Sequence, residues 1–130
     1  MPEIAPLKGL LYNQKLIGNM DEVITPPFDV ISPEEQEMYH KRHPYNIIRL
    51  ILGQQQPGDN EENNWYVRAA EALEAWQRDE VLIRDSKQAF YDYEIRYQES
   101  PDVSKTRQGF LCLVKLHKFS QGSVLPHERT

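Results

Sequence analysis

The sequence predicts an α+β fold, in which a mixed or antiparallel sheet with a C-terminal β-hairpin is covered by one long helix and one short helix. Two patterns lead to this prediction. Apolar residues recur every three or four positions from 65 to 76, the period of an amphipathic helix, and alternate strictly from 89 to 97, the period of a half-buried strand. The length of 130 residues suits one domain. We therefore expect residues 1–130 to form a single N-terminal domain, or a fragment of one, of a longer protein.

The first segment, residues 4–32, mixes short apolar runs with Gly, Asn and Pro, which favours loops and short strands. Its best strand candidate spans residues 28–31, directly after Pro26 and Pro27, which restrict the backbone. On a strand, the side chain of Asp29 would point away from its two apolar neighbours. Two interpretations stay open: a carboxylate that accepts hydrogen bonds from a nearby loop, or a substrate-binding carboxylate at a strand end that faces a pocket.

A short helix is predicted over residues 33–41. Ser32 suits the N-cap, a proline occupies the first helical position, and Glu35 completes a capping box. Pro44 ends this helix. The run that follows, residues 46–52, is rich in β-branched residues and leucine and is bounded by a Gly- and Pro-containing loop, so it predicts a buried strand.

The long helix is predicted from residue 61 onward, because its apolar residues follow the helical period and charged residues lie between them. We expect one stripe of this helix to face the sheet; it consists of Trp65, Ala69, Leu73 and Trp76.

An antiparallel hairpin is predicted over residues 88–119. The alternation puts Tyr91, Tyr93 and Ile95 on one face, which we expect to be covered, and charged residues on the other. A shift of one residue would bury the charged side chains instead, so the pattern leaves little choice of register.

The overall charge excludes one class of partner. Fifteen Lys and Arg against twenty Asp and Glu give a net charge of −5, and the cations are scattered along the chain. Nucleic-acid binding depends on a basic surface that neutralises phosphates, so we expect no nucleic-acid partner.

No apolar stretch approaches the roughly 20 residues of a membrane helix, so we expect no membrane partner. A single cysteine and an N-terminus unlike a signal peptide predict a cytoplasmic protein. The sequence indicates no oligomeric state.

Three side chains could carry chemistry but have simpler interpretations. Cys112 lies in an apolar run without cationic neighbours, which predicts a buried packing cysteine. His40 and His43 have a spacing that could place two metal ligands on one helix face. The sequence offers no second Cys or His pair, so we predict no metal site and interpret the two histidines as a solvated helix end, where basic residues suit the helix dipole.

The chain ends on four polar residues, His127, Glu128, Arg129 and Thr130. Arginine holds phosphate oxygens in a bidentate manner, and His or Glu serves as a general base. These groups are therefore suited to hold a phosphate and move a proton. On composition alone, a solvated tail is the competing interpretation.

Three motifs together carry a family resemblance: "PPFDVIS" at Pro26–Ser32, "HPYN" at His43–Asn46, and the pattern of His127, Glu128 and Thr130. Along almost its whole length the chain resembles the N-terminal part of the family known as domain of unknown function 1015. His43 stands where the family usually has Asn. Members of the family are considerably longer and carry an Asp-Gly-His-His-Arg motif farther on, so we expect this chain to be a fragment.

The resemblance implies a function through that later motif, which looks like the nucleotide or phosphate signature of the ParB and sulfiredoxin-like superfamily. It implies a phosphotransferase or hydrolase with a nucleotide as ligand or cofactor. His127 and Glu128 would then be catalytic, and Asp29, Arg129 and Thr130 would bind substrate or phosphate. The second hypothesis is a non-catalytic module that binds a metabolite or protein, for which the tyrosines of the 88–97 segment would provide a surface.

Overall fold

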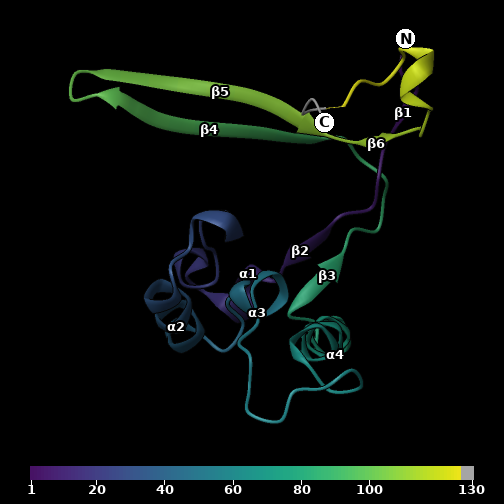
Figure 1. Ribbon diagram of the computed structural model, residues 1–130. Helices are drawn as coiled ribbons and strands as arrows, with labels where there is room; N and C mark the ends of the chain where they lie inside the picture. The colour runs from purple at the N-terminus through teal and green to yellow at the C-terminus, as the bar shows by residue number, and fades with distance from the viewer. Residues whose placement is uncertain (127–130) are drawn as a thin grey trace. The chain divides into compact units, whose positions relative to one another are not determined.

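A computed structural model of the chain describes residues 1–126 (Figure 1). These residues divide into two compact units: residues 10–84, which we call the helical unit, and residues 1–9 with 85–126, which we call the hairpin unit. The α+β class is confirmed, since helices and small antiparallel sheets are both present. The described residues contain three separate two-stranded sheets in place of the single sheet that we expected.

The helical unit begins with β2 (Leu10–Tyr12) and ends with β3 (Leu82–Arg84), and these two strands pair antiparallel in a small sheet. Between these strands lie four α-helices and two 3₁₀ turns, as Figure 1 shows for the helices: α1 (Gln14–Ile17), η1 (Met20–Glu22), η2 (Phe28–Val30), α2 (Pro33–Arg42), α3 (Ile48–Ile51) and α4 (Trp65–Arg78). No helix in residues 1–126 has the length and hydrophobicity needed to cross a membrane.

Helix α2 is confirmed and extends one residue beyond its predicted end, to Arg42. Both halves of the capping box are present: Glu35 N donates to Ser32 Oγ at 3.2 Å, and Ser32 N donates to Glu35 Oε2 at 2.9 Å. These bonds satisfy backbone donors that a helix start leaves without partners. They explain why a purely local sequence signal located this helix correctly.

The predicted strand at residues 28–31 is wrong, because the segment forms the 3₁₀ turn η2. Val30 N donates to Pro27 O and Ile31 N donates to Phe28 O, so backbone donors that a strand would offer to a neighbouring strand are used within the turn. Pro27 is well suited to precede such a turn, because its φ is already restricted.

The predicted strand at residues 46–52 is also wrong, because most of it forms helix α3. The side chain of Asn46 accepts a hydrogen bond from Ile48 N at 3.0 Å and donates to Glu22 O at 2.7 Å. Ile47 N donates to Val23 O at 2.8 Å. Contacts with a distant turn therefore start a helix in a run whose residues prefer strands.

The core of the helical unit forms where α4, the β2–β3 sheet and the first turns meet. Its buried members are Ile17, Val23, Trp76, Val81 and Leu82. The Trp76 ring lies 6.2 Å from the ring of Tyr12 and 5.8 Å from that of Tyr45, in the tilted and edge-on arrangements that aromatic pairs favour.

The predicted apolar stripe of α4 is only partly buried. Trp76 is 5 % exposed, Trp65 and Ala69 are half-buried, and Leu73 is 37 % exposed. The reason is that α4 packs against α3 and β3, which cover a narrower part of its surface than the sheet we expected.

In the hairpin unit, β4 (Tyr91–Ser100) pairs antiparallel with β5 (Val103–Leu111) around a turn at Pro101 and Asp102. At the base of the unit, β1 (Ile4–Ala5) pairs with β6 (Leu113–Val114), and η3 (Phe119–Gln121) follows. Tyr91 links β4 to Gly9 and Asp85, since its hydroxyl accepts from Gly9 N at 2.7 Å and donates to the Asp85 carboxylate.

The face of β4 that we expected to be covered is open: Tyr93 is 45 % exposed and Ile95 is 38 % exposed. None of the buried hydrophobic side chains found in residues 1–126 belongs to the hairpin unit. Cys112, predicted to be buried, is half-buried.

Candidate functional site

The sequence-predicted site residues lie mostly at the end of the chain. His127, Glu128, Arg129 and Thr130 fall outside the described residues, so their proposed grouping stays a prediction. Asp29 is exposed in the turn η2, beside Phe28 and Val30, which are exposed as well. The strand end on which we expected Asp29 is absent, and its role in binding also stays a prediction.

A different group of side chains meets at a small cavity of about 160 Å³ inside the helical unit. Helix α2 contributes His40, α3 contributes Arg49, and α4 contributes Trp65 and Arg68. The rest of the lining comes from the loop after α3 and from α4: Gly53, Gln54, Gln56 and Ala72. Two arginines and one histidine thus line a single cavity.

Arg49 is held by the C-terminal end of α2. Its Nε donates to Pro44 O at 2.8 Å, its Nη2 donates to His40 O at 2.8 Å, and its Nη1 lies 3.4 Å from His40 Nδ1. The carbonyl of His40 is one that a helix end leaves without an intrahelical partner, and Pro44 lies just beyond the end of α2. Within residues 1–126, Arg49 forms no ion pair with a carboxylate, so its charge is not neutralised by direct contact.

The contacts of His40 define which of its nitrogens carries the proton. Nε2 lies 3.2 Å from Leu52 O, which can only accept, whereas Nδ1 faces an Arg49 N–H, which can only donate. A neutral ring with its proton on Nε2 satisfies both partners. Burial, together with the positive charge of Arg49, lowers the pKa of His40 below its ordinary value of 6.5, although the bond to Leu52 acts in the opposite direction.

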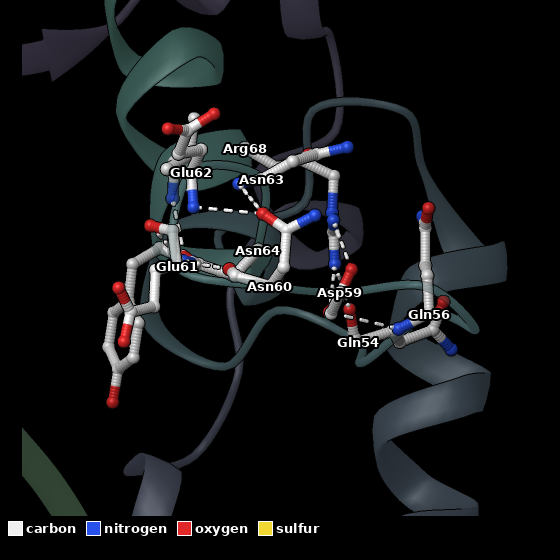
Figure 2. A network of polar contacts seen from close by, with 11 residues as sticks. Gln54, Gln56, Asp59, Asn60, Glu61, Glu62, Asn63, Asn64 and Arg68 are labelled. Atoms are coloured by element: carbon white, nitrogen blue, oxygen red, sulfur yellow. Dashed lines mark hydrogen bonds and ion pairs between the residues drawn. The ribbon is translucent and has the colours of Figure 1, made fainter.

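Arg68 fixes the loop between α3 and α4, as Figure 2 shows. Its Nη1 and Nη2 donate to the two carboxylate oxygens of Asp59 at 2.8 and 2.9 Å, and Nη2 also donates to Gln54 O at 2.9 Å. The hydrogen bond from Arg68 holds the pKa of Asp59 below its ordinary value and raises that of Arg68. Asp59 Oδ2 also accepts from Gln56 N at 3.1 Å. The ion pair of Asp59 and Arg68 therefore binds the loop at both Gln54 and Gln56.

Asparagines complete the loop and start α4. Asn60 Oδ1 accepts from the backbone N–H of both Glu62 and Asn63 at 2.9 Å. Asn64 Oδ1 caps α4 by accepting from Tyr66 N and Val67 N. Asparagine favours this role because its short side chain reaches the first backbone donors of a helix. The capped start of α4 therefore presents Trp65 and Arg68 to the cavity from a fixed position.

Close packing brings the two walls of the cavity together at Gly53. A Cβ placed on Gly53 would lie 3.2 Å from Trp65 Cβ and 3.4 Å from Trp65 O. A larger residue would push the end of α3 away from the start of α4. Gln36 of α2 binds the same part of the backbone, since its Nε2 donates to Leu52 O at 3.1 Å and to Gly53 O at 3.2 Å.

The interpretation of His40 and His43 as a solvated helix end needs correction, because both rings are half-buried and each has its own partners. His43 Nδ1 accepts a hydrogen bond from Tyr45 N at 3.0 Å. This two-residue reach is the contact that an Asn side chain makes in a turn. His43 therefore makes the kind of turn contact that an Asn side chain often makes.

Sequence reasoning missed His40, Arg49 and Arg68 as members of one site. Arg49 did carry a signal, since it is a lone cation in the apolar run 46–52, where a charge needs a specific partner. Arg68 resembled an ordinary surface residue of an amphipathic helix. Nothing in the spacing indicated that the two arginines meet.

The comparisons with known proteins support the resemblance seen in the sequence. A family model described as "Protein of unknown function (DUF1015)" matches residues 4–130, nearly the whole chain. No curated protein and no solved structure matches.

Proposed function

We propose that this chain, which belongs to the DUF1015 family, forms part of a nucleotide- or phosphate-handling enzyme of the phosphotransferase or hydrolase class, and that its arginine-lined cavity binds the phosphate group. One observation carries the proposal. Arg49 and Arg68 line the same cavity, and Arg49 has no carboxylate in contact with it within residues 1–126. An uncompensated guanidinium in a half-buried position favours an anionic ligand.

The size of the cavity limits what it can hold. Its volume of about 160 Å³ is well below the roughly 300–1,000 Å³ of pockets that enclose a whole small-molecule ligand. It therefore suits one anionic group, and the remainder of a nucleotide would lie outside it. Trp65 lines this cavity and also the neighbouring apolar pocket with Leu50 and Tyr66, and its flat ring could stack against a base.

Within this proposal, His40 positions Arg49 and does not transfer protons. Both of its ring nitrogens already have partners, and its lowered pKa keeps it neutral at physiological pH. The cavity therefore supplies anion binding and no general base. Separately from this cavity, we assign proton transfer or orientation of the acceptor to His127 and Glu128, because the family resemblance implies it.

The remaining predicted residues have binding roles in the proposal. Arg129 contacts a phosphate oxygen, Thr130 adds a hydrogen bond, and Asp29 contributes a carboxylate to the substrate side. Phosphoryl transfer depends mainly on positioning and on stabilising negative charge, which is what arginine and threonine side chains provide. We propose that the reaction takes place in the cytoplasm, because a chain with one cysteine suits a reducing compartment.

The alternative function is a non-catalytic module that binds a metabolite or a protein. The observation that favours it is the exposed row of Tyr93, Ile95 and Tyr97 on β4. Tyrosine is common in binding surfaces, because its ring is apolar and its hydroxyl forms hydrogen bonds.

The two functions can be separated by titrating the ¹⁵N-labelled chain with inorganic phosphate and then with ATP, while recording the Nε–H signals of the arginines. The phosphate proposal predicts saturable shifts at Arg49 and Arg68. Arg78 serves as the internal control, because it is exposed at the end of α4 and pairs with Asp79. Unchanged signals of Arg49 and Arg68 would remove the phosphate proposal and leave the binding module.

A substitution tests the geometry of the site. Arg49→Lys keeps the charge but loses the planar array of donors, so we expect the Kd for phosphate to rise about tenfold or more. Arg78→Lys is the matched control and should leave the Kd unchanged. Because Arg49 also binds the end of α2, the far-UV circular dichroism of the variant must match that of the wild type before its affinity is interpreted.

A further inference from the structure

The hairpin β4–β5 has one face that is rich in aromatic residues, and side chains of that face are exposed. In its register, Tyr93 is opposite Gly109, Ile95 is opposite Arg107, and Tyr97 is opposite Lys105. Side chains alternate between the two faces of a strand, so Tyr93, Ile95 and Tyr97 lie in one row. Their exposed fractions are 45 %, 38 % and 43 %.

The same hairpin has two open edges. Within residues 1–126, β4 pairs only with β5, and no third strand joins them. A two-stranded hairpin is marginally stable by itself in water, and unpaired strand edges readily accept another strand. Strands of ten and nine residues are long for exposed edges. The hairpin is therefore suited to add a strand.

The two edges differ in their ability to pair with themselves. On β5, Lys105 and Arg107 lie near the middle of the strand. Antiparallel self-pairing centred on either residue, or on Thr106 between them, would bring cations opposite one another. Like charges in opposite positions are unfavourable, and edge cations are a common protection against such pairing.

The sequence of β4, in contrast, is complementary to itself. Tyr93 and Tyr97 are equidistant from Ile95, as are Glu94 and Arg96. A twofold axis at Ile95 would place Glu94 opposite Arg96 of a second copy, and Arg96 opposite Glu94 of that copy. It would also place the tyrosines opposite each other and Ile95 opposite Ile95. Opposite charges and aromatic residues both stabilise cross-strand pairs.

We propose that two copies of the chain pair antiparallel along β4, about a twofold axis at Ile95. The product is a four-stranded antiparallel sheet in the order β5, β4, β4, β5, which places the aromatic rows of the two copies side by side. The contact is isologous, as a twofold axis requires, and uses the same residues on both copies. The dimer proposal rests on residues of β4, none of which belongs to the proposed phosphate site.

The first test is the mass of the wild-type chain in solution, measured by size-exclusion chromatography with light scattering over a range of concentrations. We expect a monomer–dimer equilibrium. Charge reversals then test the register: Glu94→Arg opposes two arginines across the axis, and Arg96→Glu opposes two glutamates. Each variant alone should raise the Kd of the dimer about tenfold or more, because two contacts per dimer change from attraction to repulsion.

Mixing the two variants separates the interface from the folding of the hairpin. Within one chain, Arg96 Nε donates to Glu94 Oε1 at 2.7 Å, so either reversal also disturbs its own hairpin. In a mixture, every pair across the axis is again one arginine and one glutamate, so the heterodimer should form with nearly wild-type affinity. Damage to the fold of each chain could not be repaired in this way.

The control is Arg107→Glu, a charge reversal of the same size on β5, one strand away from the proposed contact. It should leave the dimer intact. A wild-type chain that stays monomeric up to millimolar concentration would overturn the proposal. So would a dimer that tolerates both single reversals, or a mixture of the two variants that stays monomeric.

Discussion

Asn46→Asp is expected to destabilise the helical unit strongly at neutral pH and much less in acid. Asn46 is fully buried, its Nδ2 donates to Glu22 O at 2.7 Å, and its Oδ1 accepts from Ile48 N at 3.0 Å. The substitution replaces only the amide NH₂ by oxygen, so it changes neither the volume nor the bond from Ile48. It converts the donor that faces Glu22 O into an acceptor.

The size of the expected loss in the free energy of unfolding follows from these contacts. At neutral pH the new carboxylate would place a negative oxygen beside a carbonyl oxygen, and Glu22 O would lose its bond to the side chain. A buried polar group without a partner costs about 1–3 kcal/mol. Leaving an uncompensated buried charge raises the typical cost to about 3–5 kcal/mol. A loss of that size is a large fraction of the roughly 5–15 kcal/mol that stabilises a whole domain.

The pH dependence has a definite sign. Burial without a cationic partner raises the pKa of the new carboxyl in the folded state above its unfolded value of about 3.9. The protonated form can donate its O–H to Glu22 O, as the amide did. The missing stability is therefore restored below the unfolded pKa and is lost as the pH rises through the folded pKa.

Urea unfolding followed by far-UV circular dichroism, at about pH 4.5 and about pH 7, measures this difference in stability between variant and wild type. The matched control is Asn63→Asp, an exposed change in the loop before α4, which should alter the free energy of unfolding by less than about 0.5 kcal/mol. A cost below about 1 kcal/mol for Asn46→Asp at neutral pH would refute the argument, because one unsatisfied buried group alone should exceed it. A cost that does not depend on pH would refute the proposed exchange of donor and acceptor.

Two further substitutions test the helical unit. Trp76→Ala should lower the free energy of unfolding by about 3–5 kcal/mol, because it removes a buried ring that contacts Tyr12 and Tyr45; a loss below about 1 kcal/mol in a denaturant titration would contradict its place in the core. Asp59→Asn should remove the ion pair with Arg68, whose contribution is present above the ordinary carboxyl pKa of 3.8 and is lost as the pH falls below it. The difference in melting temperature between wild type and Asp59→Asn should therefore shrink in acid, and a difference that stays constant across the acid range would contradict this role for the ion pair.

Local signals predicted the elements whose bonds are local. Ser32 and Glu35 are three residues apart, and both halves of the capping box that they predict are present. The alternation from Tyr91 onward likewise describes a strand that pairs with the segment directly following it. In each case the partner lies close by in the sequence, so the pattern contains the information needed.

Segments whose partners are far away were predicted wrongly. Residues 46–52 have the composition of a buried strand, but Asn46 and Ile47 bond to Glu22 and Val23, and these contacts favour a helix. Residues 28–31 were predicted wrongly for a different reason. Their hydrogen bonds are local, but no periodic pattern in a short apolar run distinguishes a strand from a turn.

For the candidate site, too, the sequence predicted what is local and missed what depends on distant residues. The family could be recognised from the sequence, because its motifs are continuous stretches such as Pro26–Ser32. The cavity could not be predicted, because His40, Arg49 and Arg68 come from three different helices and converge only when α2, α3 and α4 pack together.

The sequence by itself determined the α+β class, the position of α2 and the family, because each depends on residues that are neighbours along the chain. Only the tertiary structure decided that residues 46–52 contain a helix, that the strands form separate pairs, and that two arginines share one cavity. The physical reason is the range of the interactions. Capping and alternation act over a few residues, whereas the contact of Asn46 with Glu22 spans 24 residues and exists only in the folded chain.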